Sequence, residues 1–163
     1  MERACFLLLL CFISGIAYGQ QLSFPELFSV LDMRPNELDT LMKKKGYRLM
    51  QKEIDSTSSL IYYSSLERND EAPTWVRSIS VMDARHGNIS SRMIAYRTYN
   101  TQEYRQLMAY LLANNYKTAN HFDFNDSKHT IYENGQQSIR VIIADNKLKN
   151  GRIVKSYKVE VGR

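Results

Sequence analysis

Apolar residues at helical spacing first mark two short segments near the start of the chain. Between residues 24 and 34 they recur every three or four positions, which is the period of one helix face. A second helix is expected over about 36–45, with Asn36 as its cap and Gly46 as the left-handed residue just past its end. The lysines at 43–45 then lie where cations complement the helix dipole, although the same run could instead form an anion-binding patch.

A longer helix is expected from about Asn100. Asn100 and Glu103 have the spacing of a capping box, and the residues that follow form a stripe with helical periodicity. The stripe consists of Tyr104, Leu107, Met108, Leu111 and Leu112. The helix is expected to end at residues 114–116.

Eight further segments favour β-strands, because they are rich in Ile, Val, Tyr and Thr and are separated by polar or turn-forming residues. They are residues 47–54, 58–65, 74–83, 91–99, 117–124, 128–133, 136–144 and 152–161. Asn134-Gly135 is a strong indication of a tight hairpin turn, and Asn150-Gly151 of a second. The charged stretch 67–73 predicts a loop, and Trp75 is expected to lead a strand and to lie in the core.

The order of these elements predicts an α+β fold made of two tandem units. Each unit would hold a helix and an antiparallel sheet of about three or four strands, with the helices packed on one sheet face. Residues 35–99 and 100–161 would be the units, because the first helix and its end match the second at a spacing of 69 residues. The matching positions are Leu38, Met42, Gly46 and Tyr47 in the first half, and Leu107, Leu111, Asn115 and Tyr116 in the second.

This arrangement resembles small periplasmic proteins built from tandem helix–sheet modules, of which the β-lactamase inhibitor protein is an example. The first half, ending its helix in Lys45-Gly46-Tyr47, is also similar to small secreted bacterial α+β proteins. The resemblance implies an exported location. It transfers no inhibitory residue, and the inhibitor has disulfides that the exported part of this chain would lack.

The first 19 residues have the pattern of a cleavable secretory signal. An apolar run at 4–16 is followed by Ala17 and Gly19, the small residues expected before cleavage at Gln20. The run is shorter than the roughly 20 apolar residues that span a bilayer, which disfavours a retained anchor. Residues 20–163 would then form a single exported domain, in the periplasm or outside the cell.

Both cysteines, Cys5 and Cys11, lie within the expected signal segment. Cys11 raises the alternative of a lipid-modified cysteine, but Leu10 stands where lipoprotein processing prefers a small residue. Without cysteine, the exported domain could hold no disulfide, thiolate nucleophile or Cys-ligated zinc. A disulfide-free exported domain fits a bacterial periplasm or cell surface.

Charge and motifs narrow the possible partners. The net charge of +5 permits contact with an acidic protein or an anionic envelope component. There is no phosphate-binding glycine motif, so nucleotide use is unsupported. No cofactor and no nucleic-acid partner are expected. His121 and Asp123 have a spacing that some metal sites use, but residues of this kind near turns are mostly surface groups, and no metal is expected.

Tyrosine is the unusual enrichment, and several tyrosines lie in expected strands beside a cation. Tyrosine and arginine together are typical of recognition surfaces, although tyrosine is also a good strand former that covers helix–sheet boundaries. The candidate binding residues are Tyr62, Tyr96, Arg97, Tyr157 and Lys158. No catalytic residue is assigned.

Three hypotheses for function follow. The favoured one is a non-enzymatic binding module that uses an exposed sheet face. A hydrolase acting on envelope or extracellular polymers would instead need a cleft where His86, His121 or His129 meets acidic residues. A structural envelope component would show only scattered apolar residues on its surface.

Overall fold

The structure, a computed structural model, describes residues 21–65 and 76–163. The expected signal segment, the 67–73 loop and Trp75 lie outside the described residues. Within them, no helix is both long enough and apolar enough to cross a bilayer.

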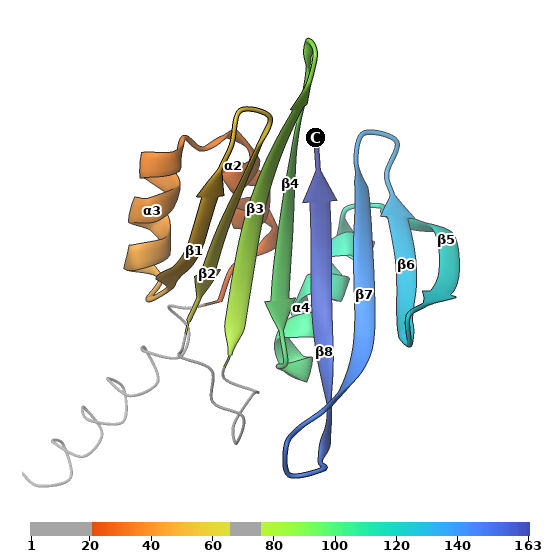
Figure 1. The fold of residues 1–163 in the computed structure, drawn as a ribbon. Coiled ribbons are helices and arrows are strands. Elements are labelled where there is room, and N and C mark those ends of the chain that lie inside the picture. Colours follow the sequence, from red (N-terminus) through yellow and green to blue (C-terminus); the bar gives the residue numbers. More distant parts are fainter. Residues whose placement is uncertain (1–20, 66–75) are drawn as a thin grey trace, which may run out of the picture.

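Three helices appear close to their expected positions (Figure 1). They are α2 (Phe24–Asp32), α3 (Pro35–Lys44) and α4 (Thr101–Ala113). The expected cap at Asn36 is wrong, because Pro35 already occupies the first turn of α3, where proline's missing N–H removes no helical hydrogen bond. The Asn100 cap is confirmed, since its side chain accepts hydrogen bonds from the backbone N–H groups of Gln102 and Glu103.

All eight expected strands are present, with ends that differ by a few residues from the expected ones. They are β1 (Arg48–Ile54), β2 (Ser58–Ser64), β3 (Arg77–His86), β4 (Ile89–Thr98), β5 (Lys117–Phe124), β6 (Ser127–Glu133), β7 (Ser138–Lys147) and β8 (Ile153–Gly162). Both expected glycine turns are confirmed by positive φ angles, 83° at Gly135 and 81° at Gly151.

The expectation of two tandem helix-plus-sheet units is wrong. The strands form one continuous antiparallel sheet in the order β1-β2-β3-β4-β8-β7-β6-β5 (Figure 1). The two halves join where β4 pairs with β8 from Met93↔Gly162 to Thr98↔Tyr157. This pairing satisfies the backbone groups of two strands that would otherwise be exposed sheet edges. In the described part of the chain, β1 and β5 are the edge strands of this sheet.

One hydrophobic core lies between the helices and the sheet. Its strand residues all point to the same face, because they alternate along each strand and are aligned between strands. These residues are Ile61, Tyr63, Ile79, Val81, Ile94, Tyr96, Ile139, Val141, Val159 and Val161. Buried residues from all three helices belong to the same cluster, among them Leu27, Leu38 and Leu111. The opposite face of the sheet, here called the open face, carries no helix within the described residues.

Candidate functional site

The open face presents aligned rows of side chains, because the strand pairing is nearly unbroken from edge to edge. One row runs across all eight strands through Gln51, Tyr62, Ser80, Ala95, Glu160, Arg140, Ile131 and Asn120. The next row runs through Arg48, Ser64, Ser78, Arg97, Lys158, Ile142, His129 and Phe122. Arg48 lies on the edge strand β1, and the other charged members of both rows gather on the central strands β4, β8 and β7.

We call this central group the cationic centre: Arg97, Lys158, Arg140 and Glu160. The Glu160 carboxylate lies 2.7 Å from Arg140 Nε and 2.7 Å from Lys158 Nζ. The side chain of Glu160 is only 9% exposed, whereas those of Lys158 and Arg140 are 28% and 43% exposed. The group holds three cations and one carboxylate, which gives it a net charge of +2.

Arg97 is the cation of this group that lacks a counter-ion. It is exposed, lies directly opposite Lys158 on the neighbouring strand, and forms no hydrogen bond or ion pair within the described part of the chain. Like charges directly opposite each other on paired strands are destabilising. The pair therefore works against stability in the isolated protein and would be relieved by a negatively charged group placed over it.

An apolar area adjoins the cationic centre on β7, β6 and β5. We call it the apolar corner: Ile142, His129, Ile131 and Phe122. Ile142 lies directly opposite Lys158 and, on its other side, opposite His129. The His129 ring is buried and stacks on Phe122, with ring centroids 4.9 Å apart.

Two buried side-chain atoms in the described residues form no hydrogen bond, and both belong to the open face. They are His129 Nδ1 and Glu160 Oε2. Oε2 is the oxygen near Arg140, so it is charge-paired even though the contact lacks hydrogen-bond geometry. Most buried polar atoms in folded proteins are hydrogen-bonded. The unsatisfied atoms thus lie on the one face that no helix covers.

The structure separates the candidate binding residues into two groups. Tyr62, Arg97 and Lys158 lie on the open face, and the last two are direct neighbours. Tyr96 and Tyr157 are buried on the helix side, so neither side chain reaches the open face. The reason is the alternation of a strand: adjacent residues such as 96 and 97, or 157 and 158, point to opposite faces.

The two buried tyrosines have structural partners. Tyr157 stacks on Tyr104 of α4, with ring centroids 4.3 Å apart, and its hydroxyl lies 3.1 Å from Thr101 Oγ1. Tyr96 donates a hydrogen bond to Glu103. Burial raises the pKa of Tyr96 well above its ordinary value, so the hydroxyl remains protonated and keeps donating.

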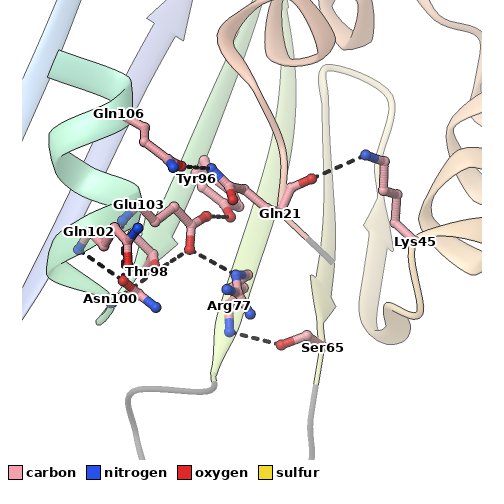
Figure 2. A network of polar contacts seen from close by, with 10 residues as sticks. All are labelled: Gln21, Lys45, Ser65, Arg77, Tyr96, Thr98, Asn100, Gln102, Glu103 and Gln106. Atoms are coloured by element: carbon pink, nitrogen blue, oxygen red, sulfur yellow. Dashed lines mark hydrogen bonds and ion pairs between the residues drawn. The ribbon is translucent and has the colours of Figure 1, made fainter. Parts of the chain in front are cut away.

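Glu103 is the centre of a buried polar network that joins α4 to the sheet (Figure 2). Besides Tyr96, its carboxylate accepts hydrogen bonds from Arg77 Nε at 2.8 Å and Thr98 Oγ1 at 2.9 Å. Arg77 is in turn held by Ser65, whose hydroxyl accepts from the Arg77 backbone N–H. Both charged side chains are almost fully enclosed, 9% and 2% exposed, so this network holds the fold and offers no surface to a ligand.

A polar cleft of about 590 Å³ lies where α2 ends beside the β1–β2 and β3–β4 hairpins. Its charged groups neutralise one another: Arg92 pairs with Asp83, and Arg163 pairs with Asp32. Arg92 also donates to the backbone oxygens of Leu31 and Met33 at the end of α2. These contacts tie the helix layer to the sheet and account for most of the cleft's charge.

The three histidines do not converge. His86 ends β3, and the strand order places β4, β8 and β7 between it and β6, which holds His129. His121 lies opposite Thr130, so it points to the face opposite that of His129. No three metal-ligating side chains cluster anywhere in residues 21–65 or 76–163.

Sequence reasoning missed Arg140, Glu160 and the apolar corner. Glu160 could have been found, because it lies two residues after Lys158 and must share its face. Arg140 and Ile142 could not, since their place beside Lys158 depends on the pairing of β7 with β8.

Comparison of the chain with protein-family models, curated proteins and solved structures gives no match. The similarity to tandem helix–sheet modules such as the β-lactamase inhibitor protein therefore stays a sequence-based expectation.

Proposed function

We propose that this protein is an exported, non-enzymatic binding module whose open face binds an acidic protein or another anionic envelope component. The observation that carries the proposal is the cationic centre, which has a net charge of +2. Within residues 21–65 and 76–163, no helix covers this sheet face, and Arg97, opposite Lys158, has no counter-ion. Retaining two opposed cations costs stability, which a binding role accounts for.

The alternative of a hydrolase has less support. It requires histidine beside carboxylates in a cleft, whereas the cleft near α2 is lined by none of the three histidines. Its carboxylates Asp83 and Asp32 are already paired with arginines. A structural envelope component remains compatible with the exposed apolar side chains, which are scattered over several elements, but it leaves the cationic centre without a role.

The proposal is tested by reversing charge on one face at a time. The variant Arg97→Glu/Lys158→Glu and the control Lys43→Glu/Arg105→Glu change the net charge equally, the control on exposed positions of α3 and α4. Tagged protein is immobilised and exposed to envelope and culture-medium extracts of the source cells.

Bound material should be retained by the wild type and by the control, and lost by the open-face variant. Retention by all three proteins would contradict the proposed function. Circular dichroism of each variant shows whether the fold is intact, so that loss of binding is not confused with unfolding.

A further inference from the structure

We infer that the open face recognises an extended acidic segment of a partner protein, with a carboxylate over the cationic centre and an aromatic side chain over the apolar corner. This inference rests on the proposed function and specifies the chemistry of the partner. It follows from the order of side chains in a single row: Arg97, Lys158, Ile142, His129 and Phe122.

The row places two kinds of contact side by side. Arg97 and Lys158 favour a carboxylate. Beside them, Ile142 and His129 are buried, and the partly exposed side chains of Phe122 and Ile131 supply the accessible apolar area of the corner. A protein segment can offer both chemistries within a few residues. An aromatic residue of the partner would bury apolar area at the corner, which salt bridges to exposed cations alone do not provide.

Other classes of partner fit less well. A polysaccharide or phospholipid surface presents repeated negative charge, and the Glu160 carboxylate inside the cationic centre opposes such an array. Along the row, Lys158 is followed by Ile142, His129 and Phe122 and by no further cation, and Arg48 lies at the opposite end of the row, on β1. A second copy of this chain, face to face, would bring two centres of net charge +2 together, which is unfavourable.

The strand spacing sets the spacing within the partner. Arg97 and His129 lie three strands apart, on β4 and β6, which is about 14 Å at the usual distance between strands. An extended peptide advances about 3.3 Å per residue, and its alternate side chains share a face. The acidic and aromatic residues of the partner are therefore expected four positions apart, which spans about 13 Å, whereas three positions would turn the two side chains to opposite faces.

The test uses synthetic nonapeptides of serine and threonine that contain one glutamate and one phenylalanine. The first has them four positions apart, and its isomer has them three apart. Each is titrated to about 1 mM into ¹⁵N-labelled protein, and backbone amide shifts are followed. Heparin and phosphatidylglycerol vesicles are titrated as separate arms.

The expected result is a saturable shift at Arg97, Lys158, Ile142 and His129 with the first peptide, and weaker binding of the isomer. Arg97→Ala/Lys158→Ala should weaken the first peptide about tenfold, and Ile142→Ser should also weaken it, while Lys43→Ala/Arg105→Ala should not. Equal binding of both isomers, or no binding of either, overturns the inference.

Binding of heparin or vesicles at the same residues without peptide binding also overturns it, but leaves the proposed function standing. Failure of the proposed function would be seen in the other experiment: Arg97→Glu/Lys158→Glu would then leave the capture of material from the extracts unchanged. Self-association of the free protein in sedimentation, abolished by that same substitution, would assign the face to a second copy and likewise overturn the inference.

Discussion

At the scale of single residues, the structure separates side chains that hold the fold from those available to a partner. Tyr96 and Glu103 are buried and hydrogen-bonded to each other, whereas Arg97, one position from Tyr96, is exposed and has no counter-ion among the residues that the structure describes. Neighbours in sequence therefore have opposite roles, because a strand turns successive side chains to opposite faces.

Replacing Arg97 by threonine should stabilise the free protein. The substitution removes the repulsion from Lys158 and introduces a residue that favours strands, so the free energy of unfolding should rise by about 0.2–1 kcal/mol. Urea unfolding followed by circular dichroism measures the change. A clear loss of stability would mean that Arg97 is a structural residue, contrary to the proposed role.

Replacing Glu103 by glutamine should have the opposite effect. The substitution leaves the Arg77 guanidinium buried without its counter-charge, and breaking a buried ion pair in this way costs about 3–5 kcal/mol. The double variant Glu103→Leu/Arg77→Met removes both charges, so its loss of stability should be smaller than that of the single variant. If the single and double variants were equally destabilised in urea, the ion pair would not be the cause.

At the scale of elements, the ends of helices and the contacts between layers are set by a few residues each. α3 and α4 are both followed by a residue with positive φ: 81° at Gly46 and 60° at Asn115. Glycine adopts this conformation without steric cost, and asparagine tolerates it better than most residues do.

Substitutions at these two positions should therefore shift stability in opposite directions. Gly46→Ala should destabilise the protein by about 1–2 kcal/mol, because alanine is strained at positive φ. Asn115→Gly should be neutral or slightly stabilising for the converse reason. Thermal unfolding of both variants measures these two changes in stability. A stabilising effect of Gly46→Ala would show that the positive φ at residue 46 is not required.

The contact between the α2 end and the sheet should weaken in acid. The hydrogen bonds from Arg92 hold the pKa of Asp83 below its ordinary value. A carboxylate with a lowered pKa in the folded state stabilises the protein above its unfolded pKa of about 4, and this contribution is lost as the pH falls through the folded value.

Asp83→Asn removes this pH-dependent contribution. The wild type should be more stable than the variant above about pH 4, and the difference should shrink as the pH falls further. Urea unfolding of both proteins at a series of pH values above and below about 4 measures this difference in stability. A difference that stays constant with pH would assign the effect of the substitution to packing and not to the carboxylate charge.

At the scale of the whole molecule, the pairing of β4 with β8 makes one sheet and one core from two halves of the chain. Val159 on β8 is buried between them, opposite Tyr96 of the first half and Val141 of the second. A substitution that shortens this side chain would leave a cavity lined by residues of both halves.

The two halves should consequently unfold together. Val159→Ala should lower the stability by about 1–3 kcal/mol in a single transition, with equal calorimetric and van't Hoff enthalpies. Hydrogen exchange should show α3 and α4 losing protection at the same denaturant concentration. Two separate transitions, with only the second half affected, would show that the halves are independent.

The sequence by itself determined the kind and position of nearly every element in the described residues. Three helices and eight strands follow from periodicity, turn residues and the Asn100 cap, since these depend on interactions within a few residues of the chain. It also placed Arg97 and Lys158 among the candidate binding residues.

Only the tertiary structure decided how the halves join and which side chains share a face. The pairing of β4 with β8, and of β8 with β7, brings Arg97, Lys158, Glu160 and Arg140 together from distant parts of the chain. Strand pairing depends on which backbone groups meet across the sheet, and a shift of one residue turns every side chain to the other face. Local patterns carry no information about that choice.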